Sequence, residues 1–333
     1  MIRKLFYLIK PIIPRPVQLF LRRIMVRRKL SRVADVWPID SGAKAQPRAW
    51  RGWPEDKEFA LVLTHDVDTQ KGHDASLFLM NLEKEKGVIS SFNFVPERYS
   101  VSAEVRQTIS TNGFEIGVHG LKHDGKLFSS RPVFDESSVR INRYIREWGA
   151  VGFRAPSMIR NLEWIKDLDI EYDASTFDTD PFEPQPEGVK TIFPFWVPAD
   201  GAKRGYVELP YTLSQDFSHF ILLGRKNISL WTEKLDWIVE NGGMALINTH
   251  PDYMNFTSGP CGREEYPAAY YLEFLDYVCT RYAGRFWLAL PRDVARFWKR
   301  NPVADAGECE CAEPLNTGIT AGYSHEKILD KST

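Results

Sequence analysis

The sequence of 333 residues has few cysteines, no excess charge of either sign and no internal repeat. Its four cysteines lack the spacing of a metal finger, and Cys309 and Cys311 are too close for an ordinary structural disulfide, which favours a reducing compartment. Lysine and arginine (43) nearly balance aspartate and glutamate (44). There is therefore no global polyanion-binding signal, and we expect no nucleic-acid partner.

The first 33 residues differ from the rest because they hold ten lysines or arginines and no aspartate or glutamate. Residues 16–31 are typical of a basic amphipathic helix that lies on an anionic membrane surface. Lys10, Arg15 and Arg22 interrupt any run long enough to span a bilayer. Lys10, Pro11 and Pro14 also disfavour a signal peptide. The alternative is a basic arm that packs on the protein's own surface.

The remaining chain divides into a linker, one folded domain and a tail. Hydrophobic content of 43% supports a sizeable core. We expect a linker at 34–57, a folded domain at 58–300 and a disordered tail at 301–333. A stretch rich in proline, glycine and aromatics at about 176–215, with strand-like pieces at 191–197 and 205–209, is interpreted as an insertion.

Strands and helices alternate through the folded domain, which predicts parallel strands with crossover helices. The expected strands are 59–64, 88–95, 114–118, 151–154, 170–173, 244–249 and 286–290. The expected helices are 74–86, 103–110, 134–148, 162–168, 229–241, 268–282 and 292–300. Asp135 is predicted to cap the start of the third of these helices.

Polar or ionisable side chains stand at the ends of five of these strands: Asp66 with Asp68, His119 with His123, Arg154, Asp173 and His250. Active sites of α/β folds are built at the carboxyl ends of parallel strands. Asp66 and Asp68 are two residues apart, so on a continuing strand both carboxylates would leave from one face. Two carboxylates at one strand tip are costly unless a cation or a mechanism requires them.

The pair His119 and His123 supplies two imidazoles on one side of the local backbone. Together with one carboxylate, they form the ligand set that catalytic zinc uses while it keeps a position for water. Two histidines at this spacing alone would more often be surface or capping residues; the Asp-x-Asp segment is what favours the metal.

Several short motifs together resemble the polysaccharide deacetylase family with a NodB-type homology domain, carbohydrate esterase family four. Its Thr-Phe-Asp-Asp-Gly motif corresponds to Thr64-His65-Asp66-Val67-Asp68, and its His-Ser/Thr-x-x-His motif to His119–His123. Its aromatic-Arg-x-Pro motif corresponds to Phe153–Pro156, and its Leu-rich strand ending in histidine to Leu246–His250. The Asp-bearing fourth motif is assigned to Tyr172–Ser175, with Asp178 and Asp180 as alternatives. The matches occur in family order over residues 59–298.

Two departures mark the branch of the family. Asp-Val-Asp replaces adjacent aspartates, and Gly120 stands where serine or threonine usually braces the metal site. In an Asp-x-Asp branch the second aspartate takes the metal, so the resemblance implies that Asp68 is a ligand and Asp66 the base. Some members of that branch work with little or no metal.

The resemblance implies a deformed (β/α) barrel, often of seven strands, that hydrolyses an N-acetyl group on an amino sugar. Zinc or another divalent transition metal at Asp68, His119 and His123 would polarise the amide, and Asp66 would take the proton of the attacking water. The remaining catalytic assignments are His250 as the acid that protonates the amine, Arg154 as the partner of Asp66, and Asp173 as the residue that orients or tunes a neighbour such as His250.

The substrate contacts assigned are Pro156, Trp196 and Tyr253. Tyr206, Tyr211 and Phe217 could join an aromatic sugar platform, with core packing as the alternative for each. The basic N-terminus suggests a cytoplasmic protein at the inner face of the membrane, acting on a lipid- or nucleotide-linked precursor of surface polysaccharide. Two other functions stay open: hydrolysis of a cyclic or small amide, and non-catalytic carbohydrate binding.

Overall fold

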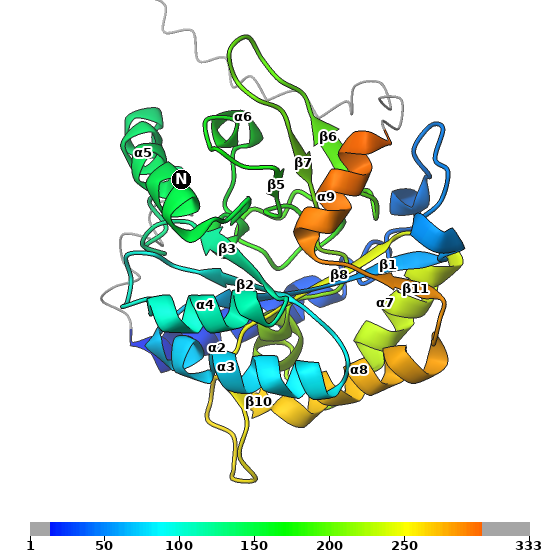
Figure 1. Ribbon diagram of the computed structural model, residues 1–333. Helices are drawn as coiled ribbons and strands as arrows, with labels where there is room; N and C mark the ends of the chain where they lie inside the picture. The colour runs from blue at the N-terminus through cyan, green and yellow to red at the C-terminus, as the bar shows by residue number, and fades with distance from the viewer. Residues whose placement is uncertain (1–13, 302–333) are drawn as a thin grey trace, which may run out of the picture.

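The computed structural model describes residues 14–301, so the predictions for residues 1–13 and for the tail from 302 onward lie outside the described chain. A curled, mostly parallel sheet forms the centre, and helices cover its outside (Figure 1). The predicted deformed (β/α) barrel is confirmed. None of the helices within residues 14–301 is both long and apolar enough to cross a membrane.

Strand β1 (Phe59–Val67) is the centre of the sheet, and all nine of its residues are buried. It pairs with β8 (Met244–Thr249) on one side. On the other side its first residues pair with β11 (Phe286–Leu288) and its last residues with β2 (Ser91–Phe94). A strand that is buried on both faces is usually a continuous apolar run. Residues 59–63 of β1 are such a run.

From β2 the sheet continues through further parallel strands: β3 (Glu115–His119), β4 (Gly152–Arg154), β5 (Tyr172–Asp173) and β7 (Tyr206–Glu208). The antiparallel β6 (Phe195–Val197) pairs with β7. Beyond β7 the chain crosses to β8, where Leu213 bridges Ile247. The barrel is thus joined through seven parallel members, with β11 beside the start of β1. The segment interpreted as an insertion therefore includes one barrel strand, β7.

The helices of the outer layer match their predictions to within a few residues. They are α3 (Gln70–Glu85), α4 (Ala103–Thr111), α5 (Arg131–Trp148), α6 (Leu162–Ile165), α7 (Ser229–Glu240), α8 (Ala268–Arg281) and α9 (Pro291–Arg300). The predicted cap at Asp135 is wrong, because α5 begins after Ser130. Asp135 lies inside the helix and pairs with Arg131, one turn earlier.

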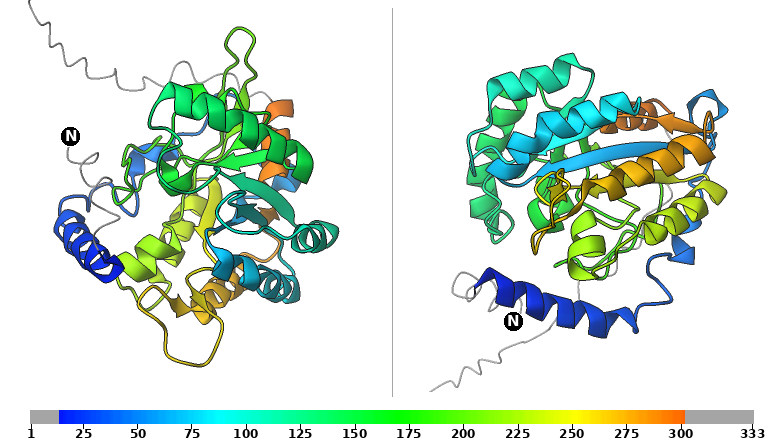
Figure 2. Two further views of the ribbon diagram at one scale, coloured as in Figure 1. Left: turned by 90° about the vertical axis from the view of Figure 1, so that its left-hand side faces the viewer. Right: turned by 90° about the horizontal axis from the view of Figure 1, so that it is seen from below.

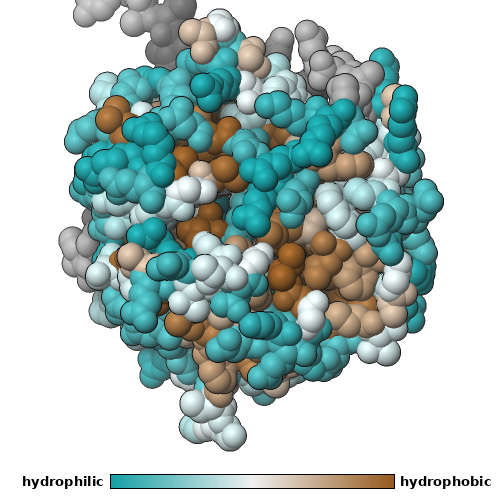
Figure 3. Space-filling model, viewed as in Figure 1, coloured by the Kyte–Doolittle hydropathy of each residue, from teal (hydrophilic) through white to brown (hydrophobic). Residues whose placement is uncertain are grey.

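Two smaller elements frame the site. A π-helix, η4 (Phe217–Leu222), follows the crossing from β7, and the short parallel pair β9 (Met254–Asn255) and β10 (Tyr266–Pro267) follows β8. The predicted N-terminal helix is α2 (Arg15–Leu30), which runs along one side of the barrel (Figure 2). Figure 3 shows a face that is mostly hydrophilic at its rim, with patches of apolar side chains near its middle.

The two-residue period of β1 sorts its polar side chains into two groups. Thr64 and Asp66 point to one face, where both contact Arg154. His65 points to the other face, where its ring lies 2.8 Å from Glu83 of α3 and 2.8 Å from Thr249 of β8. One strand thus carries both a catalytic candidate and a buried polar anchor for the outer helices.

Candidate metal and catalytic site

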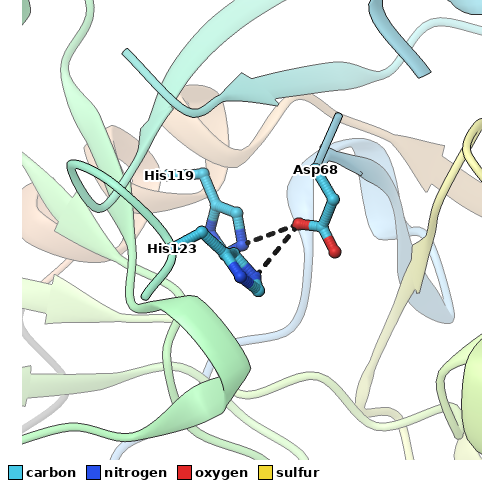
Figure 4. Close-up of side chains that lie close together, drawn as sticks. All are labelled: Asp68, His119 and His123. Carbon is cyan, nitrogen blue, oxygen red and sulfur yellow. Dashed lines mark ion pairs between the residues drawn. The ribbon is translucent and has the colours of Figure 1, made fainter. Parts of the chain in front are cut away.

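Asp68, His119 and His123 come together as a possible metal-binding triad (Figure 4). Asp68 follows the end of β1, His119 ends β3, and His123 lies in the loop after β3. The Nε2 atoms of His119 and His123 are 3.4 Å and 3.1 Å from Asp68 Oδ1, and one donor atom from each residue lies within 4.8 Å of the others.

The chemistry of the three donors fits a divalent transition metal. Asp68 Oδ1 is buried and accepts no hydrogen bond. The Nε2 atoms of His119 and His123 both face it. An unsatisfied buried carboxylate oxygen is unfavourable unless another positive group binds it. Burial would raise the pKa of Asp68, but the charge of His123 and the contacts with both imidazoles hold it well below its usual range. The carboxylate is therefore ionised, as a ligand must be.

The loop that carries the histidines has a backbone that needs glycine. Gly120 has a φ of +60°, and a Cβ there would lie 2.3 Å from Pro156 Cγ. His119 Nδ1 lies 3.1 Å from the carbonyl oxygen of Arg154, which can only accept, so Nδ1 carries the proton and Nε2 is left as the ligand atom. Gly120 thus allows Pro156 to pack on the loop while Arg154 orients His119.

Asp66 sits next to the triad in a set of hydrogen-bond donors. Asn93 of β2 donates to its Oδ1 (3.0 Å) and Asn248 of β8 to its Oδ2 (2.8 Å). Arg154 Nη1 lies 3.3 Å from Oδ1, which confirms the predicted contact. Burial would raise the pKa of Asp66, but the charges of Arg154, His119 and His250 outweigh it and lower the pKa to about 2. Asp66 stays ionised at neutral pH.

Asp216 holds His250 from the segment before η4. Its Oδ1 lies 2.7 Å from His250 Nδ1, and its Oδ2 accepts from the His250 backbone N–H (2.7 Å) and from Tyr266 (3.0 Å). Burial would lower the pKa of His250, but the charge and hydrogen bond of Asp216, followed by the charges of Asp68 and Asp66, raise it to about 10. His250 is therefore protonated at neutral pH, with Nδ1 directed to Asp216.

The predicted partnership of Asp173 with His250 is wrong. Asp173 accepts a hydrogen bond from Ser175 (2.5 Å), and its pKa is raised well above the usual range by burial and by the charge of Glu208. Glu208, also with a raised pKa, accepts from the backbone of Ser175 and Thr176. Asp173 and Glu208 form a buried pair of acids. Asp216 takes the place beside His250 that was expected for Asp173.

The assigned substrate contacts lie in three different settings. Pro156 packs on Gly120 beside a cavity of about 160 Å³ that His123 also lines. The Tyr253 ring lies between His250 (5.0 Å between centroids) and Phe217 (5.1 Å). Trp196 lies on β6 and packs over Gly205. Tyr206 and Tyr211 are buried in the core.

Four residues of this site were missed by sequence reasoning: Asn93, Asn248, Asp216 and Asp252. Asn93 and Asn248 carried a signal, because each is a polar residue within a buried apolar strand. Asp252 accepts from the backbone N–H groups of Asp68 (2.9 Å) and Thr69 (2.9 Å), and so fixes the end of β1. Asp216 gave no signal, since no strand or motif precedes it.

Among known proteins, several solved structures share the architecture of this chain. No protein-family model matches the chain, and no curated protein sequence does. A solved structure from Mycobacterium smegmatis, described as a polysaccharide deacetylase, is 22% identical with a TM-score of 0.58, over 77% of this chain and 95% of its own. One from Pseudomonas aeruginosa PAO1 with the same description is 20% identical with a TM-score of 0.56, over 74% and 93%.

The chain has the polysaccharide deacetylase fold. This fold is not confined to deacetylases, because the PuuE allantoinase structure is 16% identical with a TM-score of 0.59, over 79% of this chain and 98% of its own. At these identities the likeness concerns the fold. The chemistry of the site depends on the side chains at the strand ends.

Proposed function

We propose that this protein is a metal-dependent hydrolase that removes an N-acetyl group from an amino sugar of a glycan or glycan precursor. The observation that carries the proposal is the junction of three parts at one end of the barrel: the metal-binding triad, the ionised Asp66 and the protonated His250. The fold shared with polysaccharide deacetylases supports the substrate class.

Zinc or another divalent cation at Asp68, His119 and His123 would supply a Lewis acid toward the amide carbonyl and the attacking water. Asp66 accepts the proton of that water, because its carboxylate is ionised and its Oδ2 lies 3.8 Å from His119 Nε2, on the triad side. Arg154, Asn93 and Asn248 keep this carboxylate in place.

His250 completes the reaction at the leaving group. An amine cannot leave as an anion, so the nitrogen must gain a proton as the C–N bond breaks. His250 is charged at neutral pH, and its Nδ1 is engaged by Asp216, so Nε2 is the atom that donates. Tyr253, whose ring centroid lies 5.0 Å from that of this imidazole, would contact the sugar. Pro156 and Trp196 stay proposed contacts.

The test is acetate release by the zinc-loaded full chain from a panel of N-acetyl sugars: chitin oligosaccharides, nucleotide-linked and lipid-linked forms. Asp66→Asn should lower the rate on the order of a hundredfold or more, since it removes the base. Asp74→Asn, an exposed position on α3, is the matched control and should not differ from wild type. No acetate from any member, with Asp66→Asn and wild type alike, would falsify the proposal.

A second candidate is hydrolysis of a cyclic or small amide by the same residues. The likeness to PuuE allantoinase favours it, with a TM-score of 0.59. The two candidates separate when allantoin and the N-acetyl sugars are offered to the same preparation. Ring opening without acetate release would replace the first candidate with the second.

A further inference from the structure

Helix α2 turns four of its six cationic side chains toward the barrel. Arg15 pairs with Glu264 (2.6 Å), Arg23 donates to the carbonyl oxygen of Ile221 (2.8 Å), and Lys29 donates to that of Pro181 (2.6 Å). Arg22 lies over the ring of Phe217 (5.0 Å). These contacts account for the basic residues on the inner face of α2 without any further partner.

The outer face of α2 is apolar instead. Val17, Phe20, Leu21 and Met25, here called the α2 outer face, are 45%, 62%, 43% and 69% exposed. Their spacing of three, four and eight residues places them on one side of a helix. Within residues 14–301, half of the eight large apolar residues that are exposed lie on this one helix. Such a concentration marks an interaction surface.

The charges around the α2 outer face indicate what covers it. Arg27 and Arg28 are exposed next to it in the last turn, and residues 1–33 contain no acidic residue. A second copy would bring two such basic helices together, and like charges repel. Residues 1–13 add three more basic residues and no acidic one, so they bring no charge complement.

We propose that the α2 outer face docks on an anionic phospholipid surface, with its apolar side chains in the interfacial layer and Arg27 and Arg28 at the headgroups. Apolar burial and attraction to anionic lipid are the two contributions that hold interfacial helices. The anchors on the inner face keep α2 fixed to the barrel, so docking would orient the whole domain.

The docking surface is connected to the active site by a short series of contacts. Arg22 of α2 lies over Phe217, whose ring packs on Tyr253, which packs on His250. If the proposed function holds, docking would bring His250 close to the membrane, as a lipid-carried amino sugar requires. Vesicle binding itself is independent of that function, so the failure of one proposal can be told from the failure of the other.

The test is flotation of the full chain with vesicles of phosphatidylcholine, with and without phosphatidylglycerol. We expect binding to the anionic vesicles only, weakened by salt. The triple variant Phe20→Gln, Leu21→Gln, Met25→Gln should lose at least about tenfold in affinity. Arg27→Gln with Arg28→Gln should lose about fivefold for each charge.

The matched control is Phe78→Gln with Val139→Gln, which alters equally exposed apolar residues on α3 and α5. It should bind as wild type, and all variants should melt as wild type because every altered side chain is exposed. No binding to anionic vesicles, or an equal loss in the control, would overturn the proposal. So would a dimer in vesicle-free solution that the triple variant abolishes, since a second copy would then be the occupant.

Discussion

Among the groups that keep His250 charged, Asp216 contributes most. Asp216 contacts both its ring and its backbone N–H, at 2.7 Å each. Asp216→Asn removes the largest contribution that raises the pKa of His250, so the pKa should fall from about 10 toward its ordinary value. The alkaline limb of the rate profile should move to lower pH, and the maximal rate should fall about tenfold or more.

The free energy of unfolding should also depend on the protonation of His250. The folded pKa of His250 lies above its usual value of 6.5, so its protonation stabilises the wild type fully below pH 6.5 and progressively less as the pH rises to about 10. Asp216→Asn should weaken this dependence and move it to lower pH, as measured by urea unfolding from pH 6 to pH 10. An alkaline limb that stays in place in the variant would contradict the assignment of His250 as the acid.

At the level of elements, the loop after β3 is shaped by Gly120. Gly120→Ala would place a methyl group against Pro156 and force a positive φ on a residue that disfavours it, at a cost of about 1–3 kcal/mol. Because His119 and His123 flank this position, zinc affinity should fall with stability. Gly259→Ala, where the added Cβ makes only ordinary contact, is the control. An unchanged zinc affinity in Gly120→Ala would show that the loop does not depend on this glycine.

Glu83 links four elements on the outer side of β1. It contacts His65 of β1 (2.8 Å), Ser90 before β2 (2.6 Å) and Tyr271 of α8. Glu83→Ala leaves these buried groups without their acceptor and should cost about 3–5 kcal/mol in unfolding free energy. Lys86→Ala, which breaks an exposed pair with Asp276, should cost less than about 1 kcal/mol. Equal losses of unfolding free energy in the two variants, measured by urea unfolding, would show that the buried Glu83 contacts stabilise the fold no more than an exposed ion pair does.

The sequence predicted the parts that follow from strand periodicity and strand ends. The polar residues expected after the strands 59–64, 114–118 and 244–249 lie together in the structure, because parallel strands bring their carboxyl ends to one edge. Residues 205–209 were expected as a strand within an insertion, whereas β7 pairs with β5 as a member of the barrel. Asp216, on the crossing from β7 to β8, was not expected at all. Both positions are set by barrel closure rather than by a local pattern.

At the scale of the whole molecule, a metal would tie the end of β1 to the loop after β3. Free zinc at about a hundredfold its Kd should stabilise the chain by about 3 kcal/mol, because ligand that binds only the folded state shifts the equilibrium. The Tm should rise by several degrees with zinc and fall again with a chelator. His123→Gln should show no such response. A Tm that does not respond to zinc in the wild type would contradict the metal assignment.

Under the proposed function, two neighbouring carboxylates have different roles: Asp68 binds the metal and Asp66 accepts the proton. The most direct measurement is the metal content of purified wild type, Asp66→Asn and Asp68→Asn after equilibration with zinc. We expect an equimolar metal content in wild type and in Asp66→Asn, and a large loss in Asp68→Asn. An Asp68→Asn variant that keeps its zinc, or a wild type that holds none, would contradict the account.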